Sequence, residues 1–286
     1  MSRRYLIVSN AGSGSMDEGL EDSVREALSS TELLRLSETQ NLGAEIERAV
    51  ADDRVVVVAG GDGTINSVVQ HIGDGTLGVV PGGTRNQFAR DLGVGDVEAA
   101  LEVLRRGAER TVDLGRINGR AFVNNAGIGL YPELVEERER TEDLLGRWPA
   151  MVAASLRLWR DADPVVATAD RDGDRRAISA WVVFVGNNRF ATTPGRLGRR
   201  ERLDDGVLDV RIVTAKRHPS RFTPAWRLLR KASWQPEGQV RTSAEKLDVA
   251  LSGPPRVVSV DGETAGPEGR LRFETEPGAL RVLAPG

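Results

Sequence analysis

A glycine-rich segment, Gly60-Gly61-Asp62-Gly63-Thr64, directly follows the apolar run from Val55 to Ala59. Four valines bounded by glycines predict a buried strand, and the glycines then allow a sharp turn that side-chained residues avoid. Without Cβ atoms, main-chain N–H groups can approach a large anion such as a phosphate. The carboxylate of Asp62 is explained if a divalent cation lies between it and the phosphates. The segment therefore indicates a nucleoside triphosphate site; the alternative is a plain strand-to-helix turn with an Asx cap.

The composition bounds the class of protein. The chain has 286 residues, 40% hydrophobic and 28% charged, with a net charge of −3. This composition is ordinary for a globular protein, and the length suffices for two domains or one large one. The small negative net charge creates no overall electrostatic attraction for nucleic acid. Because there are no cysteines, disulfides, thiolate metal sites and a Cys nucleophile are excluded.

The first 110 residues alternate between strand-like and helix-like patterns. Strands are expected at Tyr5–Val8, Val55–Val58 and Leu77–Val80, with helical faces around residues 42–50 and 97–104. Repeated β–α units with continuous apolar strands predict a doubly wound parallel sheet, an α/β fold. Ligands bind beyond the carboxyl ends of such strands, so three loops should converge there. These loops contain Asn10, residues 60–64 and residues 81–86.

After about residue 111 the pattern changes to short strand candidates separated by Asp-Gly turns. This predicts a mostly antiparallel, β-rich, sandwich-like second domain. A helical insert is expected at residues 132–160, where apolar residues form either a lid for an acyl chain or ordinary core.

Three further motifs join the first glycine loop. They are Ser9–Gly14 after the first strand, Pro81-Gly82-Gly83-Thr84-Arg85-Asn86-Gln87-Phe88-Ala89-Arg90 after the third, and Leu203–Val210 followed later by Asp261-Gly262-Glu263. In this order and spacing the motifs resemble the diacylglycerol kinase catalytic-domain superfamily, which includes soluble bacterial lipid kinases and sphingosine kinases. The resemblance extends from about Tyr5 to Leu283.

The resemblance implies a nucleotide-binding α/β domain of residues 1–112 and 270–286. It also implies a β-rich lipid-substrate domain of residues 113–269, with ATP and Mg²⁺ in the cleft between the two. The nucleotide would contact residues that match the family's three loops: Asn10, Ser13, Gly60, Gly61, Asp62, Gly63, Thr64, Asn66, Thr84 and Asn86.

The resemblance also assigns roles to three acidic residues, Glu263, Asp62 and Asp205. Glu263 matches the general base proposed for soluble bacterial members, whereas the sphingosine kinases are thought to use the residue that matches Asp62. Asp62 lies inside the glycine loop and is a candidate metal or phosphate-side carboxylate, and Asp205 matches a carboxylate linked to a structural Mg²⁺. Asp261 either orients Glu263 or forms an Asx turn.

The chain departs from the family pattern at three single positions and in the run 189–193, which replaces a Gly-rich run found in many relatives. Ala11 replaces a proline, Gln87 replaces an aspartate after Asn86, and Ser15 replaces a basic residue found in some relatives. These changes affect the expected metal arrangement more than the expected catalysis.

The segment 216–234 combines basic and aromatic residues and contains no Asp or Glu. This composition is typical of a peripheral membrane contact, and equally of a solvated basic helix packed by its tryptophans. No nucleic-acid-reading module and no bilayer-spanning stretch is recognisable in the sequence. We expect a cytoplasmic protein, associated at most with the inner membrane face.

The sequence therefore predicts an ATP- and Mg²⁺-dependent lipid kinase that transfers the γ-phosphoryl group to a hydroxyl of diacylglycerol or a related lipid. Two alternatives stay open: a kinase of a soluble alcohol or nucleotide, as in NAD kinases, and a lipid- or nucleotide-binding regulator without turnover. The motif from Pro81 to Arg90, together with Asp261-Gly262-Glu263, favours the lipid kinase.

Overall fold

The apolar runs near the N-terminus form a parallel sheet. The computed structural model describes residues 3–10, 16–28, 31–36, 39–129, 164–192, 198–215 and 239–286. Strand β1 (Arg4–Ser9) lies inside the parallel sheet, with a neighbouring strand on each side. It pairs in parallel with β2 (Thr31–Arg35) and with β3 (Arg54–Gly60), and β3 pairs in parallel with β4 (Thr76–Pro81). The order β4-β3-β1-β2 confirms the predicted parallel α/β sheet, although β2 was not predicted.

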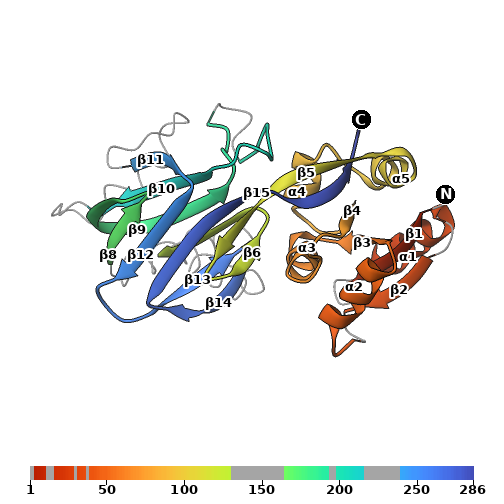
Figure 1. Cartoon of the computed structure of the whole chain (residues 1–286), viewed down its shortest axis with the longest axis horizontal. Helices are drawn as coiled ribbons and strands as arrows, with labels where there is room; N and C mark the ends of the chain where they lie inside the picture. Colours follow the sequence, from red (N-terminus) through yellow and green to blue (C-terminus); the bar gives the residue numbers. More distant parts are fainter. Residues whose placement is uncertain are drawn as a thin grey trace, which may run out of the picture.

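Five helices accompany this sheet in the described ranges: α1 (Met16–Ala27), α2 (Leu42–Ala51), α3 (Asp62–Val69), α4 (Gln87–Asp91) and α5 (Val97–Arg106). Side-chain caps explain where two of them begin, because Asn41 accepts a hydrogen bond from Ala44 N and Asp96 accepts one from Ala99 N. Strands β1–β4 and helices α1–α5 are called the α/β part below (Figure 1).

Antiparallel strands form most of the remaining described structure. They are β5 (Ala108–Ile117), β6 (Arg120–Phe122), β7 (Asn125–Gly129), β8 (Val165–Arg171), β9 (Asp174–Asn187), β10 (Leu208–Thr214), β11 (Gln239–Ala244), β12 (Lys246–Leu251), β13 (Arg256–Val260) and β14 (Glu263–Glu268). Strands β6–β14 are called the β-rich part. Asp172-Gly173 and Asp261-Gly262 have positive φ at both residues and link β8 to β9 and β13 to β14. These are the tight hairpin turns that Asp-Gly pairs favour.

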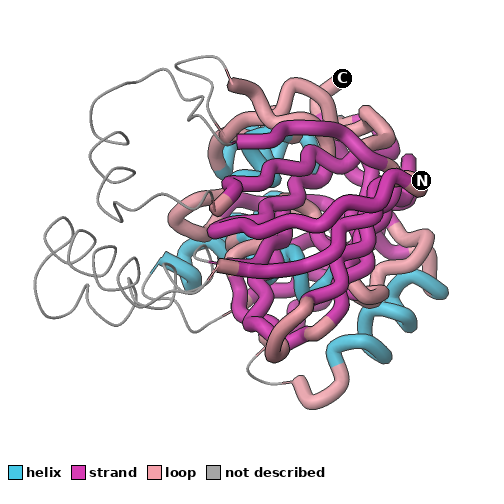
Figure 2. Tube along the Cα trace, turned by 90° about the vertical axis from the view of Figure 1, so that its left-hand side faces the viewer, coloured by secondary structure: helices cyan, strands magenta, loops and turns pink. Residues whose placement is uncertain are grey.

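One long strand, β15 (Arg270–Ala284), joins the two parts. Its first residues pair antiparallel with β12, and near its end Arg281 and Val282 pair in parallel with Thr76 and Leu77 of β4. β15 also runs antiparallel to β5, so all strands form one hydrogen-bonded sheet. Figure 1 shows β15 crossing from the β-rich part to the α/β part, and Figure 2 shows strands filling the body of the molecule.

Two buried apolar clusters lie on this framework. The first packs the α/β part and includes Leu280, Val282 and Leu283 from the end of β15. The second fills the β-rich part around Phe122, Ile128 and Phe273. The predicted combination of a parallel α/β fold and a β-rich fold is therefore confirmed. The expected insert 132–160 and the whole of the segment 216–234 fall outside the described residues.

Within the described ranges, no helix has both the length and the apolar character that a membrane span requires.

Candidate active site

The loops that follow β3 and β4 touch through their backbones. Gly82 N donates a hydrogen bond to Gly60 O at 2.9 Å. A Cβ added to Gly83 would lie 2.7 Å from the Cα of Gly61, so a side chain at either glycine would separate the loops. Asn10 follows the neighbouring strand β1 and is exposed, whereas Ser13 lies outside the described residues. The structure thus brings together the second and third predicted loops.

Asn86 closes the third loop upon itself. It has a left-handed backbone with φ of 46°, and its side chain accepts a hydrogen bond from Gly83 N and donates one to Gly83 O. Thr84, in contrast, is exposed at the tip of the loop. Asn86 therefore shapes the loop, and Thr84 is available to contact a ligand.

Asp62 connects the two glycine-bearing loops. Its Oδ2 accepts a hydrogen bond from Gln87 N at 2.9 Å, and its Oδ1 accepts one from Phe88 N at 3.0 Å. These are the first two amides of α4, which have no partner within that helix. Oδ1 also accepts a hydrogen bond from the side-chain amide of Asn124 at 3.1 Å. Asp62 is consequently both the first residue of α3 and the cap of α4.

Asp261 anchors the tip of the β13–β14 hairpin. Its carboxylate accepts hydrogen bonds from three consecutive backbone amides, those of Val123, Asn124 and Asn125, and from the side chain of Asn66, at 2.7–2.9 Å. Burial raises the pKa of the Asp261 carboxyl, and the four hydrogen bonds oppose that shift. Since these contacts hold the turn that precedes Glu263, they place Glu263 as well.

Glu263 reaches from the β-rich part to the first glycine loop. Its Oε1 lies 2.6 Å from the position that a Cβ on Gly63 would occupy. Its Oε2 lies 3.5 Å from the guanidinium of Arg120, and its side chain is 49% exposed. Gly63 and Glu263, which are 200 positions apart in the sequence, are therefore in contact, and the Glu263 carboxylate stays accessible to solvent.

Thr64 and Asn66 are buried, 6% and 1% exposed. The Asn66 side chain donates to Ala121 O at 3.1 Å and to Asp261. Gln70, one turn further along, also bonds both Asn66 and Ala121. Asn66 thus helps to join α3 to the β-rich part, and this is the role that its described contacts support.

Asp205 lies beside a backbone N–H group and a positively charged side chain. Its carboxylate faces Arg189 N at 3.3 Å and the guanidinium of Arg202 at 3.5 Å. The nearby Asp113, which was not predicted as a site residue, accepts hydrogen bonds from Gly206 N, Gly278 N and the Asn188 side chain. The link between Asp205 and a structural cation therefore stays a prediction.

No group of three or more His, Asp or Glu side chains suited to a metal occurs in the described part of the chain. An Mg²⁺ ion that is bound to a nucleotide needs fewer protein ligands, because phosphates, waters and one or two carboxylates complete its coordination. Asp62 accepts three hydrogen bonds and a carboxylate has about four acceptor positions, so one position on Oδ2 fits such an ion.

Sequence reasoning missed the polar residues that join the two parts: Asp91, Asp113, Arg120, Asn124 and Arg200. Asn124 follows an apolar strand, which is the signal that identified the other loops, and it could have been selected in the same way. Arg200 carries no local signal, because its partners lie 13 to 109 residues away.

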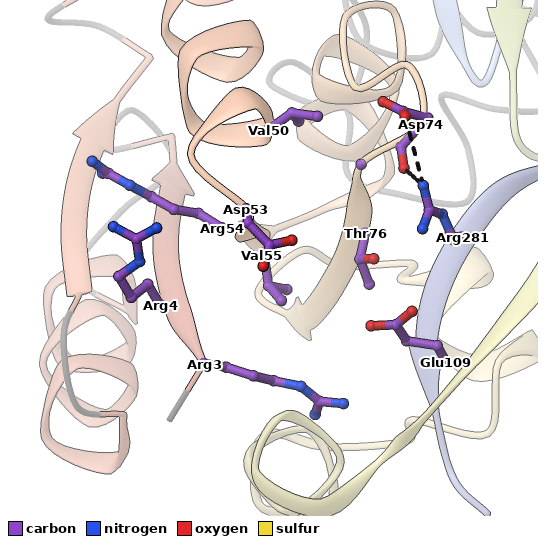
Figure 3. A pocket seen from close by; sticks show the side chains of 11 residues that line it. Arg3, Arg4, Val50, Asp53, Arg54, Val55, Asp74, Thr76, Glu109 and Arg281 are labelled. Carbon is purple, nitrogen blue, oxygen red and sulfur yellow. Dashed lines mark hydrogen bonds and ion pairs between the residues drawn. The ribbon is translucent and has the colours of Figure 1, made fainter. Parts of the chain in front are cut away.

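A cavity of about 650 Å³ lies at the opposite end of the parallel strands (Figure 3). Arg3, Arg4, Arg54 and Arg281 line it together with three acidic side chains. Each guanidinium already has an oxygen partner in the protein: Gly107 O, Asp52 O, the carboxylates of Glu32 and Asp52, and Asp74 O, respectively. The cavity therefore lacks the glycine loops, and its guanidinium groups are already hydrogen-bonded within the protein.

Comparisons with known proteins agree with this geometry. The diacylglycerol kinase catalytic domain family matches residues 4–117, and the YegS C-terminal NAD kinase beta sandwich-like domain family matches residues 133–284. The chain is 32% identical to "Probable lipid kinase YegS-like" of Pseudomonas aeruginosa, over 84% of this chain and 80% of that protein. It is 29% identical to "Diacylglycerol kinase" of Bacillus subtilis, over 77% of this chain and 74% of that protein.

A solved structure of a diacylglycerol kinase from Bacillus anthracis superposes with a TM-score of 0.69. The match covers 99% of this chain and 97% of that one, at 18% identity. At this level of identity the likeness establishes the shared fold alone.

Proposed function

The chain belongs to the family of diacylglycerol kinases and YegS-like lipid kinases, and on that premise we propose that it transfers the γ-phosphoryl group of ATP to a hydroxyl group of diacylglycerol or a related lipid. Family membership supports phosphotransfer to an alcohol. The choice of a lipid as acceptor rests on the names of the relatives, and the choice of ATP as donor rests on the glycine loops.

The contact between Glu263 and Gly63 carries the proposal. An accessible carboxylate placed against a glycine loop at the start of a helix is the arrangement that phosphoryl transfer to an alcohol needs. The loop offers main-chain N–H groups and a helix N-terminus to the phosphates. On this proposal the carboxylate would meet the acceptor hydroxyl beside the phosphates that the loop binds.

Each group then has a defined task. The loops at Gly60–Thr64 and Pro81–Asn86 hold the phosphates, with Thr84 and Asn10 exposed beside them. Mg²⁺, held by the phosphates and Asp62, would neutralise charge on the phosphates. Glu263 accepts the hydroxyl proton late in a loose transition state, because an ordinary carboxylate is too weak a base to remove it beforehand. Asp261 and Arg120 keep Glu263 in place.

Two alternatives are a kinase of a soluble alcohol or nucleotide, which differs in the acceptor, and a binding regulator, which differs in having no turnover. A soluble alcohol or nucleotide would be phosphorylated without any lipid surface, and a regulator would bind ATP or lipid without transferring phosphate.

We further propose that the protein works in the cytoplasm at the inner membrane face, with the basic and aromatic segment 216–234 as the contact.

The deciding experiment measures transfer from labelled ATP, with Mg²⁺, to diacylglycerol, ceramide and lipid extracts in mixed micelles, and to glycerol and NAD in solution. We expect labelled lipid and no labelled soluble acceptor. Glu263→Gln should lower kcat by about 10²–10⁴-fold and leave ATP affinity unchanged. Glu268→Gln, an exposed change on the same strand, is the matched control. Labelled glycerol or NAD alone, or no transfer at all, would refute the lipid kinase.

A further inference from the structure

Arg200 is a fully buried arginine at the junction between the two parts of the molecule. Its side chain is 0% exposed, and its guanidinium donates only to oxygen atoms. Nε donates to Asp91 Oδ2 at 2.8 Å, and Nη1 donates to the carbonyl oxygens of Val123 at 2.6 Å and Asn187 at 3.1 Å. Asp91 belongs to α4, whereas Val123 and Asn187 belong to the β-rich part. One side chain therefore ties α4 to two segments of the other part.

Asn124 continues this connection to the glycine loop. Its Oδ1 accepts a hydrogen bond from Arg200 Nη2 at 2.7 Å, and its Nδ2 donates to Asp62 Oδ1 at 3.1 Å. Asp62 in turn caps the first amides of α4, and α4 ends at Asp91. The contacts form a closed ring through Asp62, α4, Asp91, Arg200 and Asn124, called the junction ring below.

The loop at residues 123–125 belongs to the junction ring and also holds the hairpin of Glu263. Through its backbone amides it binds Asp261, which precedes Glu263. Through the Asn124 side chain it binds Asp62, which precedes Gly63. The same short loop thus fixes both partners of the contact between Glu263 and Gly63.

We propose that Arg200 and Asn124 are positioning residues, which hold the two parts at the angle that places Glu263 against the glycine loop. The catalytic half of this inference rests on the lipid kinase function proposed above. Neither residue needs to touch a substrate. Their effect passes through Asp62 and α4 on one side and through the loop 123–125 on the other.

The chemistry of the junction ring favours positioning over simple stabilisation. A buried ion pair gains little net stability over apolar residues of the same size, because both charges lose their water. What the pair adds is directionality, since a planar guanidinium accepts only a narrow range of partner positions. Here that directionality acts between elements that are 109 residues apart in the sequence.

The test uses Asn124→Ala, which removes the link between Arg200 and Asp62 and leaves the backbone bonds of Asn124 intact. Arg200→Lys is the second variant, because it keeps the buried charge but cannot serve four acceptors with the same geometry. Asn118→Ala is the matched control. The Asn118 side chain also makes two hydrogen bonds in a turn, to Arg270 O and from Arg272 N, away from the junction ring.

The first readout is a distance and does not depend on activity. Because the chain has no cysteine, Glu47→Cys on α2 and Val166→Cys on β8 allow two spin labels, one in each part. Both positions are exposed. We expect Asn124→Ala and Arg200→Lys to shift or broaden the distribution of distances between the labels. The control Asn118→Ala should match the otherwise unchanged labelled chain.

The second readout is kinetic. We expect both ring variants to lower kcat for the lipid by about 10–100-fold, as misplacement of a reacting group by about 1 Å does, with little change in the KM for ATP. A wild-type distance distribution in both variants, or an unchanged kcat, would overturn the inference. If the wild-type protein phosphorylated no acceptor, the proposed function would fail, and the distances alone would still decide whether the ring sets the angle.

Discussion

Replacing Gly63 by alanine separates the catalytic role of the Glu263 contact from any structural role. Gly63 is the second residue of α3, so its backbone is helical and alanine is compatible with it. Alanine in a helix interior is more favourable than glycine by about 0.5–1 kcal/mol. The new methyl group, however, would lie 2.6 Å from Glu263 Oε1. Stability and activity should therefore change in opposite directions.

The size of the effect follows from that distance. To reach ordinary contact at about 3.4 Å, the carboxylate must move by about 0.8 Å. The move costs little stability, because Glu263 is half-exposed and its side chain is flexible. Displacement of a reacting group by about 1 Å can lower the rate by about 10²-fold. We expect kcat to fall by about 10–100-fold, while the free energy of unfolding stays equal or rises.

The assay compares four proteins in a double-mutant cycle: wild type, Gly63→Ala, Glu263→Gln and the double variant. If the methyl group acts by displacing the base, it should have little further effect on kcat once Glu263 is glutamine. Gly19→Ala in α1 is the matched control, because nothing lies within 4 Å of its added Cβ. Independent, multiplicative losses in the double variant would refute the reasoning and show that the methyl group disturbs the nucleotide instead.

Two further predictions concern stability. Hydrogen bonds from Arg35 and Ser9 to the buried Glu21 lower the pKa of its carboxyl below the usual 4.5. The stability that Glu21 contributes is therefore fully present above pH 4.5 and is lost as the pH falls through the lowered pKa. Thermal unfolding between pH 3 and 6 should show a weaker acid dependence for Glu21→Gln. Asp261→Asn suits the left-handed turn but sets an amide against N–H donors, so denaturant unfolding should show a loss of about 1–3 kcal/mol.

The parts of the fold that depend on local patterns were predicted from the sequence. The valine run of β3 is buried because it lies in a parallel sheet, and its length and composition show this directly. The Asp-Gly pairs at residues 172–173 and 261–262 form hairpins because that pair tolerates two positive φ angles. Strand β2 was missed, since Thr31–Arg35 is only partly buried and lacks a continuous apolar run.

The contacts that assemble the site could not be predicted in this way. Asn124 lies 62 residues from Asp62, and Arg200 lies 109 residues from Asp91. No periodicity or spacing links such pairs, because their residues lie far apart in the chain and the two parts are joined into one sheet by β15. The motifs showed which loops carry ligand-binding chemistry, whereas the partners of each carboxylate depend on the complete fold.

Those partners bear on which carboxylate acts as the base, a choice that the sequence left open between Glu263 and Asp62. Asp261 accepts four hydrogen bonds from N–H groups, and Asp62 accepts three. Four donors fill the acceptor positions of the Asp261 carboxylate, so it could take up a proton only by releasing one of them, and each unpaired buried donor costs about 1–3 kcal/mol. Glu263 meets Arg120 at 3.5 Å and keeps half of its side chain exposed. These contacts support the proposed assignment of Glu263 as the base and of Asp62 to the phosphate side of the site, while Asp261 holds the hairpin.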